Sequence, residues 1–145
     1  MTYRNERKIT TYIIVTDSFT KTDENIGYKE LEKQDRKEGW FGCRFHKIIK
    51  RDGKIEDGKE INQSSVILND RETKRVKNNM SISVCLIGGQ SDKGKPDCNY
   101  TFKQFKALRK LYDNLKSNYP VVECIGHRDV TDSASPSFDV SELMR

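Results

Sequence analysis

Two short runs of mostly apolar residues constrain the fold of this chain more than any other feature. Residues 10–17 read TTYIIVTD and residues 80–89 read MSISVCLIGG. Both runs are typical of buried strands, and the first is nearly all apolar. A strand that is apolar on both faces lies inside a sheet that helices cover on each side. The sequence therefore predicts an α/β fold built around a central sheet.

Turn and helix signals place two further elements between these strands. Residues 27–39 favour a helix that ends at Gly39, although the apolar face of this helix is thin. Residues 44–58 favour a hairpin, in which the pair Asp52-Gly53 is expected to form a type I′ turn.

The second half of the chain contains the strongest helix. Residues 100–120 carry apolar side chains at spacings of three and four, with Thr101 as the expected N-cap. Residues 121–126 favour a third short strand, and residues 137–145 a last short helix that Ser137 is expected to cap. The order β-α-β-β-β-α-β-α predicts a central mixed β-sheet flanked by helices in three layers.

Composition and length set broad limits on the protein. The 145 residues suit a single domain spanning residues 1–145, and the net charge of +5 reflects 27 basic and 22 acidic residues in a mixed pattern. The absence of a long apolar run predicts that the chain does not span a membrane. The absence of a secretory signal predicts residence in the cytoplasm.

Two segments of the chain are rich in basic residues, and one of them lies within a longer polar stretch. Basic residues at 4–8 and 71–77 are weighed as a nucleic-acid patch, but a solvated surface is the preferred interpretation, so no direct nucleic-acid partner is expected. Residues 59–79 are highly charged, and they predict a long surface loop.

Four cysteines, Cys43, Cys85, Cys98 and Cys124, are expected to be reduced thiols. Two of them form C-x₂-H pairs with His46 and His127, which together have the ligand set of a Cys₂His₂ site. Residues three apart on a strand face opposite sides, so a relocated zinc site stays an open but disfavoured alternative.

Several motifs in a fixed order give the chain a family resemblance. It resembles the type 2 N-acetylmuramoyl-L-alanine amidases from about residue 10 to residue 144, most closely the small lysozymes of short-tailed phages. The wider group includes the peptidoglycan recognition proteins. The resemblance rests on GWFGCRFHKIIKRDGKIEDG, MSISVCLIGG, DKGKPD, TFKQFKALRKL and the segment from GHRD to PSFD.

The resemblance implies a groove for the stem peptide of peptidoglycan, with a Zn²⁺ held by two histidines and one cysteine. It assigns the three ligand positions to Thr16, His127 and Ser135 of this chain. A tyrosine and a lysine assist catalysis in the family, and Phe45 and Ser133 stand at those positions.

These positions have lost the side chains that the family chemistry requires. Neutral hydroxyls are poor zinc ligands beside thiolate and imidazole, so no metal and no catalytic residue is expected here. A tryptophan-histidine pair usual in the first helix is replaced by Gln34 and Asp35. A hydrolytic triad of Asp17, Ser133 or Ser135, and His127 has no supporting nucleophile motif and is disfavoured.

The resemblance also implies a role that needs no metal. The phage lysozymes that this chain resembles bind the single-subunit RNA polymerase of the phage through a surface that includes the N-terminal segment. We therefore expect an inactive amidase homologue that binds a protein partner, with that polymerase as the first candidate, in the cytoplasm of the infected bacterium. The alternatives are a peptidoglycan-binding protein without catalysis and a still active cell-wall amidase that uses Zn²⁺.

Overall fold

The computed structural model describes residues 6–145, and it contains the eight predicted elements in the predicted order. The strands are β1 Tyr12–Asp17, β2 Lys47–Ile49, β3 Ile55–Asp57, β4 Ser81–Leu86 and β5 Glu123–Gly126. The helices are α1 Tyr28–Lys37, α2 Phe102–Asn118 and α3 Val140–Leu143, with short 3₁₀ turns η2 Asn78–Met80 and η3 His127–Asp129.

The five strands form one mixed sheet in the order β3-β2-β4-β1-β5. Strands β2, β4, β1 and β5 run parallel to one another, and the edge strand β3 runs antiparallel to β2. The two apolar runs of the sequence are β1 and β4, which lie side by side in the interior. The predicted mixed sheet is therefore confirmed, with the most apolar strands where burial is greatest.

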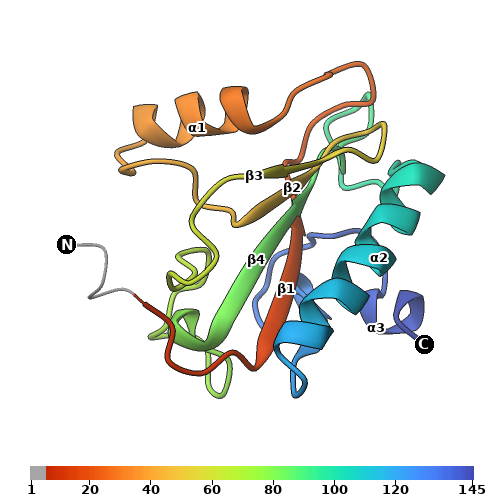
Figure 1. Ribbon diagram of the computed structural model, residues 1–145. Coiled ribbons are helices and arrows are strands. Elements are labelled where there is room, and N and C mark those ends of the chain that lie inside the picture. The colour runs from red at the N-terminus through yellow and green to blue at the C-terminus, as the bar shows by residue number, and fades with distance from the viewer. Residues whose placement is uncertain (1–5) are drawn as a thin grey trace.

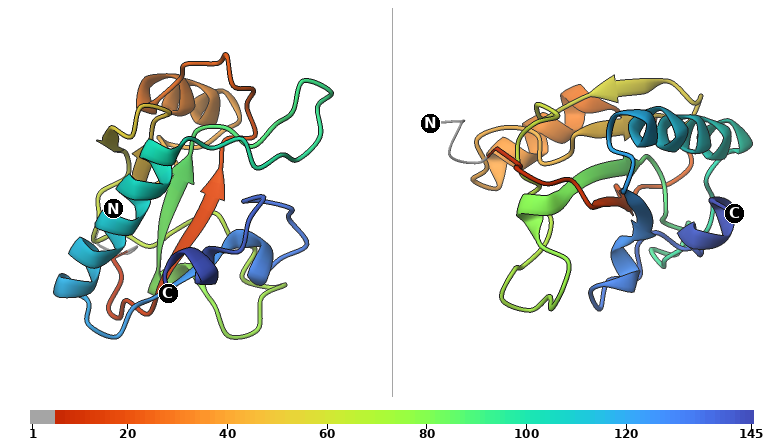
Figure 2. Two further views of the ribbon diagram at one scale, coloured as in Figure 1. Left: turned by 90° about the vertical axis from the view of Figure 1, so that its right-hand side faces the viewer. Right: turned by 60° about the horizontal axis from the view of Figure 1, so that its bottom comes forward.

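Helices cover the two faces of the sheet, as Figures 1 and 2 show. On one face, Ile13 and Val15 of β1 pack with Leu108 and Leu111 of α2 and with Val140 of α3. On the other face, α1 packs over β2 and β4, and the loop after β3 packs over β1. The predicted three-layer arrangement is confirmed.

The hairpin between β2 and β3 forms, but the predicted turn type is wrong. Gly53 has a φ of 88°, and Phe19 is the one non-glycine residue with positive φ among the described residues. A type I′ turn needs positive φ at both central residues, which Asp52 does not have. The Gly53 amide donates to the Lys50 carbonyl at 2.8 Å, and the Lys50 amide donates to the Lys54 carbonyl at 2.9 Å. This is a three-residue loop that ends on a left-handed glycine.

Helix caps divide into one correct and one wrong prediction. The Thr101 hydroxyl accepts from the Gln104 amide at 3.1 Å and caps α2 as predicted. Helix α3 is capped by Asp139, whose carboxylate accepts from the Ser141 amide at 3.1 Å. Ser137 lies two residues too early to cap it, and its hydroxyl oxygen is buried without a partner in the described part of the chain.

The polar stretch between β3 and η2 forms a long loop, as predicted. Residues 58–77 contain no helix and no named strand. The loop is anchored by Leu68 and Val76, which both pack on Ile14 of β1. Within residues 6–145, no helix has the length and apolar character to cross a membrane.

Candidate functional site

A cleft of about 330 Å³ opens at the carboxyl end of β1. This is the edge at which parallel sheets present polar side chains to ligands. Its lining includes three segments that are far apart in the sequence: the end of β1, the residues that lead into β2, and the segment from Ser133 to Ser137. Single residues, Ile67, Gly89, Pro96 and His127, complete it. The site positions assigned by the resemblance, Thr16, Phe45, His127, Ser133 and Ser135, all contribute to its lining.

Three of these positions meet in a hydrogen-bonded cluster. The hydroxyl of Thr16 lies 3.1 Å from Nδ1 of His127 and 2.9 Å from the hydroxyl oxygen of Ser135. The Asp17 amide donates to the same Ser135 oxygen at 2.8 Å. We name Thr16, His127 and Ser135 the hydroxyl cluster.

These contacts engage the polar atoms of all three residues of the hydroxyl cluster. The Ser135 oxygen accepts from the Asp17 amide, and either hydroxyl can donate in the bond between Thr16 and Ser135. Thr16 also shares a hydrogen bond with His127 Nδ1. Burial lowers the pKa of His127, and the nearby Arg44 guanidinium lowers it further, so the imidazole is neutral at pH 7. The cluster is thus uncharged, and both of its hydroxyls are engaged.

Asp17 belongs to the opposite face of β1, as the alternation along a strand predicts. Its carboxylate accepts from the Tyr100 hydroxyl at 2.5 Å and from the Phe19 amide at 3.1 Å. Burial raises the pKa of Asp17. His127 Nδ1 contacts Thr16 instead of a carboxylate, so the triad of Asp17, a serine and His127 is not assembled.

Phe45 and Ser133 complete the set of assigned positions. Phe45 is buried and packs against Ile48 and Cys85, so its ring serves the apolar cluster under α1. The Ser133 hydroxyl accepts from the Ser135 amide at 3.1 Å, which shapes the loop that carries Ser135.

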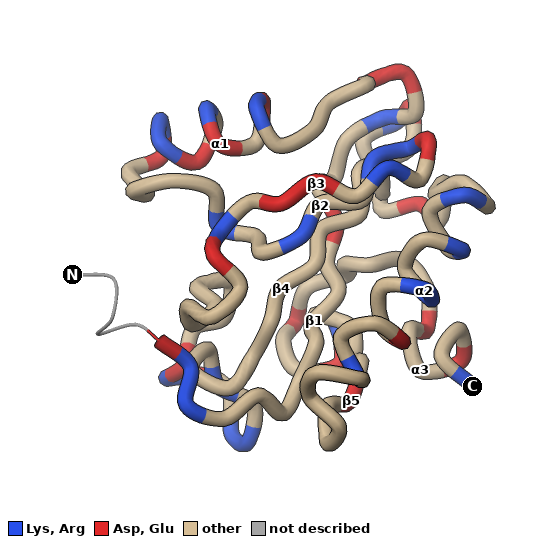
Figure 3. The backbone as a smooth tube through the Cα atoms, viewed as in Figure 1, with Lys and Arg blue, Asp and Glu red and all other residues tan. Residues whose placement is uncertain are grey.

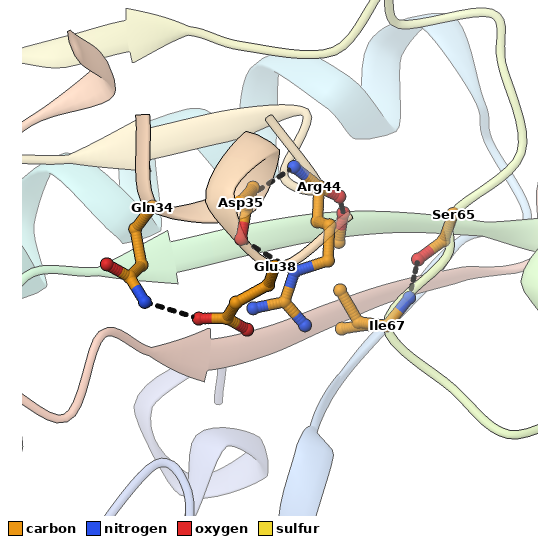
Figure 4. Close-up of polar contacts among 7 residues, drawn as sticks. Gln34, Asp35, Glu38, Arg44, Ser65 and Ile67 are labelled. Carbon is orange, nitrogen blue, oxygen red and sulfur yellow. Dashed lines mark hydrogen bonds and ion pairs between the residues drawn. The ribbon is translucent and has the colours of Figure 1, made fainter. Parts of the chain in front are cut away.

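Arg44 lines the same cleft, and it belongs to a buried pair that the sequence interpretation missed. Asp35 is the one buried residue of α1, at 2% exposure. Its two carboxylate oxygens accept from the backbone amide and the Nε of Arg44, each at 2.9 Å (Figure 4). An acidic residue at a core-facing helix position was the available signal, because a buried carboxylate requires a partner.

The two C-x₂-H pairs do not converge. His46 is fully buried, with Nδ1 accepting from the Ser83 amide at 2.9 Å and Nε2 donating to the Gln63 carbonyl at 2.8 Å. Cys124 packs in the α2 core cluster, on the face of the sheet away from the cleft. In the part of the chain that the structure describes, no three His, Cys, Asp or Glu side chains form a group suited to a metal ion.

The basic segments hold structural as well as solvated side chains. Figure 3 shows Lys and Arg interspersed with Asp and Glu over the whole described chain. Arg7 donates to the Gln63 carbonyl at 2.5 Å, and Lys77 donates to the Asp70 carbonyl at 2.6 Å. Arg4, which the proposed basic patch included, lies outside the described residues. These engagements support the preferred interpretation of a mixed surface.

Comparison with known proteins places this geometry in a family. The endolysin of Enterobacteria phage T3 is 38% identical over 134 residues, which are 92% of this chain and 85% of the relative. The endolysin of Enterobacteria phage K11 is 33% identical over 142 residues, which are 97% of this chain and 89% of the relative. The chain belongs to the family of amidase-type phage endolysins and peptidoglycan recognition proteins. No protein-family model matches it.

Solved structures agree with the fold of this endolysin-family chain. The N-acetylmuramoyl-L-alanine amidase LysC from Clostridium intestinale has a TM-score of 0.72 at 20% identity, covering 92% of this chain and 82% of that structure. The recognition protein PGRP-SA of Apis mellifera has a TM-score of 0.71 at 20% identity, covering 94% and 82%. The resemblance inferred from the motifs is confirmed, and a cell-wall amidase-like function is what the endolysin homologues support.

The donor set of this endolysin-family chain does not fit the zinc ion that its family implies. A tetrahedral zinc site draws on imidazole, thiolate or carboxylate donors. The hydroxyl cluster offers one imidazole and two neutral hydroxyls, and these hydroxyls are already bonded to one another. An ion could enter only by breaking those bonds in exchange for weak ligands.

Proposed function

We propose that this protein is a non-catalytic member of the endolysin family that holds no zinc and acts by binding a partner. The single observation that carries the proposal is the hydroxyl cluster, in which Thr16, His127 and Ser135 satisfy one another. The positions that the family uses for chemistry have become a neutral cross-link between β1 and the 133–137 segment. The surrounding fold persists, which is the pattern expected when binding outlives catalysis.

The first candidate partner is the single-subunit RNA polymerase of the phage, acting in the cytoplasm of the infected bacterium. The resemblance assigns that contact to the N-terminal segment and its surroundings. Glu6, Lys8 and Ile9 line a groove of about 720 Å³ together with the start and end of the 64–80 loop. Ile9 is 67% exposed, so the groove presents an apolar side chain to solvent. The groove shares no lining residue with the cleft that holds the hydroxyl cluster, so a partner could bind the groove while the cleft is empty.

Peptidoglycan is the second candidate ligand, because the cleft itself persists. Its volume of about 330 Å³ lies within the range of small-ligand sites. The recognition proteins that share this fold take their name from that polymer. A sedimentation assay with purified cell walls separates this candidate from the polymerase.

Metal analysis and a turbidity assay test the absence of catalysis. The purified protein is assayed on outer-membrane-permeabilised cells with and without a chelator, beside a lytic endolysin as positive control. We expect substoichiometric zinc and no lysis in either condition. Lysis that the chelator abolishes would overturn the proposal.

Pull-down with the cognate polymerase tests the partner. We expect the polymerase to be retained and transcription to fall when the protein is added. Ile9→Asp should weaken retention, because a charge at an exposed apolar contact is costly to desolvate. Ile55→Asp, which alters a 36% exposed side chain on β3, is the matched control and should leave retention unchanged. Recovery of no polymerase, with transcription unchanged, counts against this partner.

A further inference from the structure

The Arg44 guanidinium, which lines the cleft, has N–H donors that form no hydrogen bond within residues 6–145. Its Nε and backbone amide are taken by Asp35, while neither terminal nitrogen has a hydrogen-bond partner within residues 6–145. Figure 4 shows these two nitrogens on the side of the guanidinium away from the Asp35 bond. Arg44 lines the same cleft as Thr16 and His127. A planar fork of free N–H donors is the group that proteins use to hold a carboxylate.

This guanidinium is held in one place by its neighbours. Asp35 fixes it through the bond to Nε, and the Asp35 carboxylate is itself fixed by the Arg44 backbone amide. The guanidinium carbon lies 5.4 Å from the ring centroid of Trp40 and 5.4 Å from that of Phe45. A donor that is positioned before binding loses little side-chain entropy when a ligand arrives.

The other charged groups around the cleft are occupied elsewhere. Asp17 accepts from the buried Tyr100 hydroxyl, and burial raises the pKa of Asp17. Glu38 accepts from the Gln34 amide group at 2.6 Å. His127 is neutral at pH 7. Within residues 6–145, Arg44 is the one Lys or Arg that lines the cleft, which suits a ligand with a single negative charge.

A second polar atom of the same cleft has no partner. The Ser137 hydroxyl oxygen is buried and unbonded in the described residues, and Ser137 lines the cleft with Arg44. A buried hydroxyl without a partner costs free energy unless a ligand or water satisfies it. The oxygen itself is buried, so a ligand in the cleft can satisfy it once the side chain turns toward the cleft.

We propose that the cleft binds a small ligand through a carboxylate, with the Arg44 fork as the anchor and the Ser137 hydroxyl as a second contact. The ligand is of amino-acid or dipeptide size, because the cleft holds about 330 Å³. The inference rests on the metal-free cleft of the proposed function, and it assigns the positive charge at the site to a side chain of the protein itself.

Trp40 provides a direct readout, because it is the single tryptophan of the chain and lies against Arg44. Tryptophan fluorescence is followed while the chelator-treated full chain is titrated with N-acetylalanine. The matched probe is N-acetylalaninamide, which replaces the carboxylate by a neutral amide. We expect a saturable signal with the acid, at about millimolar affinity, and at least about tenfold weaker binding of the amide.

Substitutions connect the signal to the proposed anchor. Arg44→Gln should weaken binding of the acid by about tenfold or more, and Arg44→Lys by several-fold, because an ammonium lacks the fork. Arg36→Gln removes the same charge from a side chain that is 58% exposed and outside the cleft lining, and it should leave binding unchanged. If Arg44→Gln fails to fold, Arg44→Lys alone decides the point.

Each alternative result is informative. Equal response to acid and amide, or acid binding that survives Arg44→Lys unweakened, overturns the carboxylate site. Tighter binding of inorganic phosphate than of N-acetylalanine overturns the choice of a monovalent ligand. No binding with or without added zinc overturns this inference alone, whereas stoichiometric zinc uptake with lysis overturns the proposed function and leaves an Arg44-dependent acid signal standing.

Discussion

Two sets of polar side chains at the cleft, called its two walls below, satisfy their buried polar groups in different ways. On one wall, Thr16, His127 and Ser135 form a neutral cluster in which hydroxyls and an imidazole satisfy one another. On the other wall, the fully buried Asp35 is paired with the partly exposed Arg44. Both walls place polar groups beside apolar core, yet one has no formal charge and the other has two.

The difference teaches where reactivity can remain. A neutral cluster whose members are bonded to one another has little to offer a ligand, because every new contact must break an existing one. An ion pair with one half-open partner keeps its positive side available, since Asp35 occupies only one edge of the guanidinium. The cleft thus combines a side chain that can recognise a ligand with positions whose family chemistry we propose is lost.

The largest effect is expected from rebuilding the neutral wall. The double substitution Thr16→His and Ser135→Cys gives that wall two imidazoles and a thiol around one point, which is the donor set of a zinc site. Zinc affinity should rise by about a thousandfold or more over the natural chain. Isothermal titration with Zn²⁺ measures it, and Ser133→Cys with Thr16→His is a control in which the thiol stands two residues away. Equal affinities in all three proteins would show that the hydroxyl cluster is not the ligand position.

The second effect comes from breaking the charged wall. Asp35→Ala leaves the Arg44 guanidinium without its buried partner, and we expect a loss of about 3 kcal/mol in the free energy of unfolding. Urea denaturation measures it. The control Asp57→Ala removes the carboxylate of an ion pair with Lys47. The Asp57 side chain is 79% exposed, so this substitution should lower the free energy of unfolding by less than about 1 kcal/mol. Similar losses for the two variants would mean that the buried pair contributes no more than a surface pair.

The third prediction compares how His46 in the core and His127 in the cleft make the stability of the protein depend on pH. Burial lowers the pKa of His46 from 6.5 to about 3, so the folded state keeps it neutral while the unfolded chain takes up a proton. Stability is then fully present above pH 6.5 and is lost as the pH falls, by about 2 kcal/mol between pH 6.5 and pH 5. His46→Gln should flatten this slope in urea denaturation more than His127→Gln does. A larger effect of His127→Gln would contradict this prediction, because it would mean that His127 is the more strongly desolvated histidine.

The smallest effect is expected within the neutral wall itself. Thr16→Val keeps the shape of the side chain and removes the hydroxyl that bridges His127 and Ser135, at a cost of about 1 kcal/mol in the free energy of unfolding. Thermal unfolding measures it, with Ser117→Ala as a control at an exposed helix position. A loss as large as that of Asp35→Ala would erase the contrast between the walls.

Local pattern predicted the elements well and their polar contacts less well. The order of strands and helices, the Thr101 cap and the loop from 59 to 79 followed from neighbouring residues. The hairpin turn did not, since Asp-Gly is compatible with two turn types and the loop length selects between them. The cap of the last helix also differed, because Ser137 and Asp139 are both good caps and the backbone path chose Asp139.

The sequence by itself determined the layered fold and its family, because apolar strands, caps and motif order are encoded by residues close together in the chain. Only the tertiary structure decided which polar groups meet. Thr16 and Ser135 are 119 positions apart and bond at 2.9 Å, and Asp35 finds Arg44 across the end of α1. The physical reason is that burial is a property of each residue, whereas a hydrogen bond requires two groups at one distance and angle, which only the packed chain provides.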